Sequence, residues 1–265
     1  LRVGALLAVG AAVINLCIYA SAYPSEQRLI GTGALSNPLL TSHVLGFFCT
    51  YWLAAWLAKS ERRDWLPILC TTPLLVALLA TGSRTPLLAL TLTSLWMLAM
   101  TPRRGAYLIG ALIALAIATF VAMPEIFLER GLSFRPQLWA DAVSQAAAKP
   151  WFGYGYDSKF IFDIPEIGRL LSDPHNVELA VLLELGAIGL ILWLVMYGAA
   201  LFRCLQQRRH AGFQIASALL VYGIAAGLTE GSSYLSRPNE SWFLIWIPLS
   251  LVAALSIQQR QLDNR

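Results

Sequence analysis

The chain has 265 residues, of which 57% are hydrophobic and 13% charged. A soluble domain carries roughly 25% charged residues, so this composition excludes an ordinary soluble protein and indicates one embedded in a lipid bilayer. The small basic excess, a net charge of +4, lies mainly in short connectors between apolar segments. Basic residues in such connectors set membrane orientation, so no nucleic-acid partner is expected.

Eight apolar segments are each close to the roughly 20 residues that a helix needs to cross the hydrocarbon core. The predicted spans are Val3–Ala20, Ser42–Ala58, Leu66–Thr81, Thr85–Met100, Ala106–Met123, Val177–Phe202, Phe213–Thr229 and Ser241–Ile257. The sequence therefore predicts an all-α, polytopic membrane helix bundle that forms one domain over residues 1–265. Because the chain begins with Leu1 rather than Met, we expect that it lacks its natural N-terminus.

An even number of spans places both termini on the same side of the membrane, and the positive-inside rule identifies that side as cytoplasmic. Its short connectors carry the basic residues Lys59, Arg62, Arg63, Arg103, Arg104, Arg203, Arg208 and Arg209. The opposite side then holds the polar, aromatic-rich segment 123–176, which we call the large loop.

The large loop contains a pattern typical of one short helix. Pro136 suits the first helical position. The apolar residues that follow at helical spacing are Leu138, Trp139, Ala142, Val143, Ala146 and Ala147. Lys149 and Pro150 end this helix, which we expect to lie on the outer membrane surface. Gly153 and Gly155 then permit a tight turn close to a helix end or a ligand.

Three arginines on the predicted outer side are candidate anion ligands. Arg84 follows a Gly-Ser turn between two apolar segments, and a charge so close to lipid usually has a partner. It is either an anion ligand or an arginine that extends to the headgroups. Arg28 is either a substrate contact or a solvated loop charge.

Arg135 stands at the start of the predicted surface helix. Its guanidinium and the unpaired backbone N–H groups of the helix end would face the same volume, a combination that suits phosphate. The alternative is a salt bridge to Glu125, Glu129 or Asp141.

His175 directly precedes the sixth predicted span, and its imidazole can accept or donate a proton near neutral pH. Asp173 and Glu178 flank it and could orient or charge the ring. The alternative is a histidine with a purely structural hydrogen bond. Glu184, about two turns into the span, must face protein or water rather than lipid. The candidate substrate contacts are Arg28, Asp173, Asn176, Glu178 and Glu184.

No metal site or cofactor is predicted. His175 has no second histidine or cysteine at ligand spacing, and His43 and His210 lack acidic neighbours in the sequence. No glycine-rich phosphate loop follows a strand, which gives nucleotide hydrolysis no support.

Four motifs, in this order, resemble those of the O-antigen ligase and O-antigen polymerase superfamily. They are Thr81-Gly82-Ser83-Arg84, then Arg135-Pro136-Gln137-Leu138-Trp139, then Lys149 to Gly155, then His175-Asn176 followed by Glu178-Leu179, Glu184 and Gly186. The resemblance covers roughly residues 28–202. The chain departs from the family at Thr85-Pro86, where small residues are common, and in the number of helices before this region.

The resemblance implies a multi-pass glycosyltransferase of the bacterial inner membrane with its active site on the periplasmic side. The implied donor is a glycan on undecaprenyl pyrophosphate, and the implied acceptor is lipid A–core in the ligases or a second lipid-linked glycan in the polymerases. The functional positions of the family fall on Arg84, Arg135 and His175.

The residue chemistry agrees with that implication. Arginines can neutralise a leaving diphosphate without a metal, and His175 can take the proton of an acceptor hydroxyl. A single displacement would invert the anomeric carbon. The sequence does not separate an O-antigen ligase from a polymerase or from another polysaccharide or protein glycan ligase. A glycolipid transporter is the remaining alternative, but the polar groups gather on one face rather than near the midplane.

Overall fold

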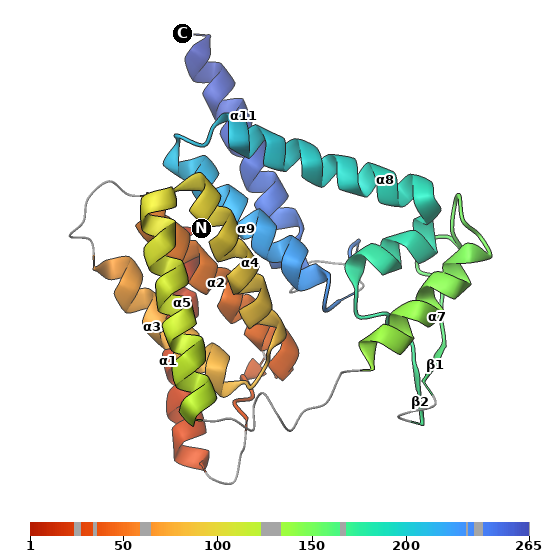
Figure 1. The fold of residues 1–265 in the computed structure, drawn as a ribbon, viewed down its shortest axis with the longest axis horizontal. Helices are drawn as coiled ribbons and strands as arrows, with labels where there is room; N and C mark the ends of the chain where they lie inside the picture. Colours follow the sequence, from red (N-terminus) through yellow and green to blue (C-terminus); the bar gives the residue numbers. More distant parts are fainter. Residues whose placement is uncertain are drawn as a thin grey trace.

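Apolar helices make up most of the chain in the computed structural model, which describes residues 1–23, 28–33, 36–58, 65–122, 134–164, 168–231, 233–235 and 241–264 (Figure 1). The helices are α1 (Arg2–Ala22), α2 (Pro38–Ala58), α3 (Leu66–Ala80), α4 (Thr85–Met100), α5 (Pro102–Ala122), α7 (Arg135–Ala147), α8 (Val177–Gln206), α9 (Ala211–Gly227), α10 (Ser241–Leu244) and α11 (Trp246–Asp263). Two short antiparallel strands, β1 (Phe162–Ile164) and β2 (Arg169–Leu171), lie between α7 and α8 in the sequence. Several residues discussed above lie outside the described part: Lys59, Arg62, Arg63, Glu125 and Glu129.

Within the described residues, most of each predicted span is helical, so the all-α membrane class agrees with the structure. Within the described residues, α1, α2 and α8 are long and apolar enough to cross a membrane, while α3, α4 and α9 are shorter apolar helices. The number of crossings therefore stays a prediction. The last predicted span is divided into α10 and α11, which meet at Ile245.

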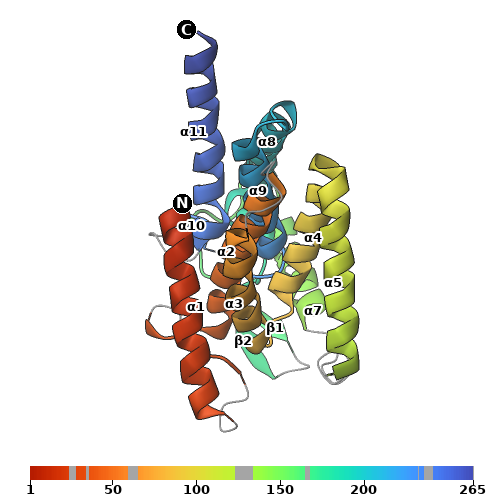
Figure 2. The same ribbon diagram turned by 90° about the vertical axis from the view of Figure 1, so that its left-hand side faces the viewer.

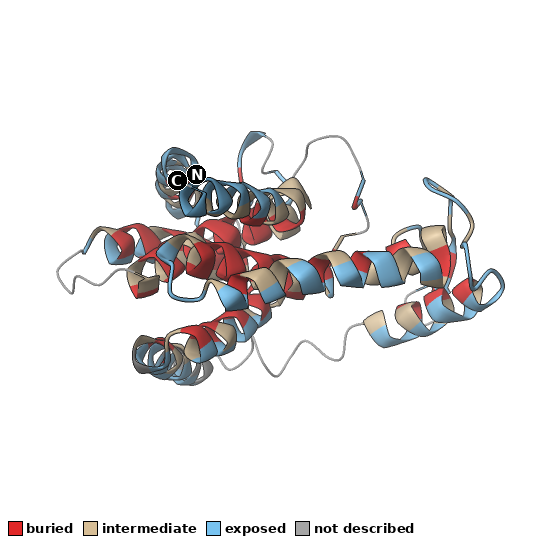
Figure 3. Cartoon of the chain, turned by 90° about the horizontal axis from the view of Figure 1, so that it is seen from above, coloured by how far each residue is buried: buried red, intermediate tan, exposed pale blue. Residues whose placement is uncertain are grey.

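The core lies where α2 packs against α3, α4 and α9. In the most apolar 18-residue stretch of α2, 67% of the residues are buried, against 17% in the corresponding stretch of α1. Figure 3 shows the buried residues concentrated on the central helices. Tyr222 of α9 donates a hydrogen bond of 3.1 Å to the carbonyl of His43 in α2. Gly46 leaves room for the Tyr222 ring. The peripheral helices keep exposed apolar side chains, which suits a bundle surrounded by lipid.

The connections at the two ends of the bundle differ. Figures 1 and 2 place the α4–α5 turn, the α8–α9 turn and the C-terminus toward one end, and α7 with the two strands toward the other. The basic α8–α9 turn and the described part of the large loop are therefore at opposite ends, as expected of the two connections that flank one membrane-crossing helix.

Helix α8 covers the sixth predicted span but is not continuous. Gly186 interrupts it with φ of 66° and ψ of −168°, and the two halves meet at a sharp bend (Figure 1). A Cβ at Gly186 would collide with the backbone of Trp151, so only glycine allows the Lys149–Gly155 turn to pack into the bend. The sequence does not reveal the interruption, because this turn, distant in sequence, supplies the hydrogen bonds that the broken helix loses.

Those hydrogen bonds replace the helical ladder on both sides of the bend. The amide of Gly155 donates to the carbonyl of Glu184 at 2.8 Å, and the amide of Ala187 donates to the carbonyl of Pro150 at 2.8 Å. Gly153 and Gly155 adopt left-handed conformations with φ of 67° and 100°. The predicted tight turn therefore lies against a helix interruption.

Helix α7 occupies the segment where the sequence predicts a short surface helix, but its apolar face is covered by protein. Leu138, Ala142 and Ala146 are buried in a cluster with Phe162 of β1 and Leu183 of α8. The two strands, absent from the prediction, supply part of this cover; three residues each are too few to show a strand period. The helix therefore packs on the bend of α8 rather than presenting that face to the membrane surface.

Candidate active site

One buried carboxylate, Glu230, joins two of the predicted site residues. It follows the end of α9 and is only 7% exposed. Its Oε2 accepts a hydrogen bond of 3.0 Å from the guanidinium of Arg135 at the start of α7. Its Oε1 lies 2.9 Å from Nδ1 of His175, immediately before α8. Three segments far apart in the chain thus converge on one carboxylate.

The sequence around His175 fixes its backbone. Asn176 caps α8: its Oδ1 accepts from the amide of Leu179 at 2.9 Å, and its Nδ2 donates to the carbonyl of Leu228 at 3.0 Å. The cap therefore ties the start of α8 to the end of α9, which carries Glu230. His175 has a left-handed backbone with φ of 49°, and its amide donates to Oδ1 of Asp173 at 2.7 Å.

Helix α7 is anchored beside the same loop. Trp139, one turn after Arg135, donates from its indole nitrogen to the carbonyl of Pro174 at 3.1 Å. The ring of Phe134 meets the His175 ring edge-on, with centroids 6.4 Å apart. The Arg-Pro-Gln-Leu-Trp motif thus places its tryptophan on the residue before His175 and its arginine on the carboxylate that contacts His175.

The cluster shifts the pKa values of both Glu230 and His175. Burial raises the pKa of Glu230, but the hydrogen bond and charge of His175 and the charge of Arg135 outweigh burial and hold that pKa below its ordinary value. The hydrogen bond with Glu230 raises the pKa of His175, aided by the charges of Glu230 and Asp173 and opposed by burial and by Arg135. Because the ionised carboxylate accepts, Nδ1 of His175 donates, and a neutral ring then carries its lone pair on Nε2.

Of the two acids that flank His175 in the sequence, Asp173 lies beside it in the structure, whereas Glu178 interacts with the second half of α8. Asp173 holds the backbone of His175, and its Oδ1 is 4.0 Å from the ring Nδ1. Glu178 lies within interaction range of Trp193 and Tyr197 in the second half of α8. The bend at Gly186 turns these halves toward one another, which explains why Glu178 is drawn to the opposite half of its own helix.

Arg28 and Arg84 lie at the turn between α3 and α4. Nε of Arg28 donates to the carbonyl of Thr81 at 2.7 Å, and the amide of Leu29 donates to the carbonyl of Ala80 at 2.9 Å. Arg84 is the residue from which α4 begins, and its side chain is partly buried. Arg28 is therefore a residue that pins its loop to this turn rather than a solvated charge.

His43 connects this turn to the cluster. It is 2% exposed, and its Nε2 lies 3.4 Å from Oγ1 of Thr85, the residue after Arg84. The charges of Glu230 and Arg135 both act on its ring. The sequence showed no acidic neighbour for His43, because the neighbour comes from the far end of α9.

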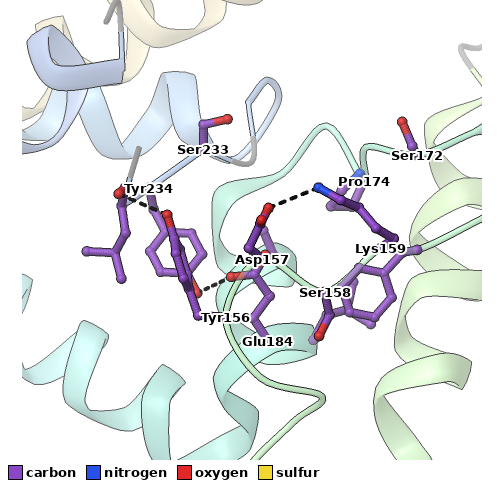
Figure 4. Close-up of a pocket in the computed structure, with 13 residues that line it drawn as sticks. Tyr156, Asp157, Ser158, Lys159, Ser172, Pro174, Glu184, Ser233 and Tyr234 are labelled. Carbon is purple, nitrogen blue, oxygen red and sulfur yellow. Dashed lines mark hydrogen bonds and ion pairs between the residues drawn. The ribbon is translucent and has the colours of Figure 1, made fainter. Parts of the chain in front are cut away.

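Glu184 lies apart from the cluster. Its Oε2 accepts a hydrogen bond of 2.6 Å from the hydroxyl of Tyr234, and it lines a separate cavity (Figure 4). Among the described residues, no group of three His, Cys, Asp or Glu side chains is arranged to hold a metal ion.

Glu230 is the functional candidate that sequence reasoning missed. It stands in Thr-Glu-Gly directly after an apolar segment, and an acid at that depth needs a buried partner. That position was the available signal. The expected salt-bridge partner of Arg135 within its own helix, Asp141, instead accepts from Gln145 at 3.3 Å.

Taken together, the fold and this cluster define a multi-pass membrane protein with a histidine, a carboxylate and an arginine gathered beside the large loop, a constellation suited to moving a proton next to an anion. Residues 69–194 match the family model described as O-antigen ligase. Over 258 residues the chain is 45% identical to the O-antigen ligase of Pseudomonas aeruginosa strain PAO1, an alignment that covers 97% of the chain and 64% of that relative. The chain thus spans just under two thirds of that relative's length. These matches confirm the resemblance to the O-antigen ligases.

Proposed function

We propose that this chain carries the transfer centre of an O-antigen ligase. The observation that carries the proposal is the Glu230–His175 contact, in which Nδ1 is 2.9 Å from the carboxylate and Nε2 is left as the proton-accepting nitrogen. The similarity to an O-antigen ligase over 97% of the chain supports this reaction class. The donor is a glycan on undecaprenyl pyrophosphate, and the acceptor is lipid A–core.

The reaction proceeds in one displacement. The acceptor hydroxyl oxygen attacks the anomeric carbon of the donor while Nε2 of His175 takes its proton. The bond from that carbon to the pyrophosphate oxygen breaks, and undecaprenyl pyrophosphate leaves with the electron pair. The configuration at the anomeric carbon inverts, and no metal takes part.

Arg135 and Arg84 stabilise the leaving diphosphate. Arg135 is at the N-terminus of α7, where the guanidinium and the helix dipole favour the same negative charge. Arg84 is at the N-terminus of α4, and His43 beside Thr85 links that turn to the Glu230 cluster. Glu230 orients His175 and stabilises the imidazolium that forms during transfer.

The site faces the periplasm in this proposal. The large loop is at the end of the bundle opposite the basic α8–α9 turn, as Figure 1 shows, and basic connectors favour the cytoplasm. In this proposal the protein is a multi-pass protein of the bacterial inner membrane.

The proposal is tested with membrane-reconstituted protein, undecaprenyl-pyrophosphate-linked O-antigen and purified lipid A–core. We expect His175→Ala and His175→Gln to lower the transfer rate by roughly a hundred- to ten-thousand-fold, the usual contribution of a general base, while donor binding is retained. His210→Gln, at an exposed position before α9, is the matched control and should transfer normally. Normal transfer by His175→Gln would show that His175 is not the base. A product in which the donor glycan is lengthened, instead of glycosylated lipid A–core, would indicate a polymerase.

A further inference from the structure

A polar cavity of about 270 Å³ lies next to the Glu230 cluster and takes no part in the chemistry above. It lies between the turn that follows Gly155, the first half of α8 and the segment after Glu230 (Figure 4). The side chains that give it its character are Tyr156, Asp157, Lys159, Glu184, Ser233 and Tyr234.

The walls of this cavity are held in place by hydrogen bonds. Tyr234 donates to Glu184 at 2.6 Å, and Tyr156 donates to the carbonyl of Leu235 at 3.0 Å. The two tyrosine rings meet edge-on with centroids 6.3 Å apart. The two chain segments are thus tied together across the cavity, so its shape is built in advance of any ligand.

Asp157 stands at the cavity in an unusual backbone conformation. Its φ is 59°, and among the described non-glycine residues only Asp157 and His175 have positive φ. Such conformations cost energy and are concentrated at functional sites. Asp157 is 73% exposed at its side chain and pairs with Lys159 at 3.0 Å, so a charged donor and a charged acceptor stand together at the cavity.

The cavity and the cluster are neighbours along two separate segments. Pro174 lines the cavity and is bonded directly to His175. Tyr234 lines it from the other side, four residues after Glu230. A molecule in the cavity is therefore held against the same two segments that carry the proton-accepting histidine and its carboxylate partner.

We propose that this cavity is the acceptor subsite and binds the sugar residue whose hydroxyl receives the glycan. The volume is below the roughly 300–1,000 Å³ of sites for drug-sized ligands and suits a single sugar ring. Carboxylate, ammonium and hydroxyl groups pair with sugar hydroxyls, and tyrosine rings offer apolar contact to the C–H face of a pyranose. This inference rests on the proposed ligase function and assigns the acceptor to one place in it.

Two variants test the subsite. Asp157→Asn keeps a residue that tolerates the left-handed backbone but removes the charge. Ser172→Trp places a large ring at the exposed edge of the cavity. Asp163→Asn, an exposed acid on β1 outside the cavity lining, is the matched control. Each is prepared as membrane-reconstituted protein.

Binding is measured first with delipidated core oligosaccharide, independently of transfer, and then the KM values for lipid A–core and for the donor are determined. We expect both variants to weaken oligosaccharide binding and to raise the acceptor KM. For Asp157→Asn the rise should be roughly ten- to a hundred-fold, the effect of losing a hydrogen bond to a charged group. For Ser172→Trp the cause is the volume that the added ring occupies. The donor KM and the Asp163→Asn control should be unchanged.

Two results would overturn the subsite: unchanged oligosaccharide binding in both variants, or a rise in the donor KM without a change in acceptor binding. Absence of oligosaccharide binding to the unmodified protein would overturn it as well. The unmodified protein could bind the oligosaccharide, with weaker binding in the variants, and yet transfer no glycan. That result would support the subsite and contradict the ligase proposal.

Discussion

At the scale of single residues, the site depends on Glu230. A buried carboxylate is costly unless it is paired, and this one is paired twice, with Arg135 and with His175. The pairing explains why a histidine before a helix can be held in one tautomer, and why an arginine at the start of α7 can remain close to a histidine without repelling it. Removing the carboxylate would leave Arg135 facing His175 with no anion between them whenever His175 is protonated.

The pH dependence of transfer tests this pairing. Glu230 raises the pKa of His175, so neutral His175 is lost as pH falls through that raised value, and transfer should fall with it. Glu230→Gln lowers the pKa of His175, and the acid limb of the kcat/KM profile should move to lower pH while the maximal rate also falls. Asp141→Asn should leave the limb in place. An unmoved limb in Glu230→Gln would show that His175 is not the titrating base.

The two proposed diphosphate ligands should require the guanidinium and not only its charge. Arg135→Lys and Arg84→Lys keep a cation but lose the planar fork that suits phosphate oxygens. We expect the donor Kd of each variant to rise by roughly ten-fold or more, the effect of about 1.4 kcal/mol. Arg209→Lys, exposed at the α8–α9 turn, is the control. Unchanged donor affinity in both variants would restrict these arginines to structural roles.

At the scale of elements, the bend in α8 positions the site. Its first half begins with the Asn176 cap beside His175, and its bend receives the Lys149–Gly155 turn that leads into the cavity. The bend therefore joins the Glu230 cluster to the large loop. Gly153 and Gly186 are required at this contact because backbone lies against backbone there, and a Cβ at either position would collide with it.

Two glycine-to-alanine substitutions in α8 distinguish the packing role of Gly186 at the bend from the general effect of glycine on helix stability. Gly186→Ala forces a Cβ into Trp151 at a left-handed position and should destabilise the protein by roughly 1–3 kcal/mol or more, the usual cost of such strain. Gly198→Ala meets open space within the same helix and should be neutral or stabilising by up to about 1 kcal/mol. Thermal unfolding in detergent measures both. Equal stabilities would contradict the packed bend.

At the scale of the whole molecule, the candidate site and the basic connector between α8 and α9 lie at different ends of the helix bundle. The cluster and the cavity are built partly from residues of α7 and of the large loop. Figure 1 shows α7 and the strands at the end away from the basic α8–α9 turn. Exposed apolar side chains cover the peripheral helices, as expected where lipid is the solvent. In the proposed function, the orientation of this bundle decides which compartment supplies the acceptor.

Thiol labelling of intact cells tests the orientation. In a Cys17→Ala background, which removes the exposed native cysteine, Ser144→Cys on α7 should react with an impermeant reagent. Gln206→Cys, equally exposed at the end of α8, should react only after lysis. The reverse pattern would place the site in the cytoplasm.

The sequence by itself determined the membrane class, the positions of the helices and the resemblance to O-antigen ligases. Apolar segments and turn residues are local signals, and the motifs around Arg135 and His175 are short enough to be read along the chain. The bend of α8 could not be read in that way, because Gly186 is equally compatible with a continuous apolar helix until the Lys149–Gly155 turn is packed against it.

Only the tertiary structure shows which carboxylate pairs with the His175 ring. Several carboxylates stand near His175 in sequence, but the partner is Glu230, 55 positions away, and the same carboxylate reaches Arg135 at a separation of 95. The choice depends on how the end of α9 packs on the start of α8 through Asn176. Charge pairing in a low-dielectric interior is set by distance in space, and distance in space is a property of the packed helices rather than of the chain.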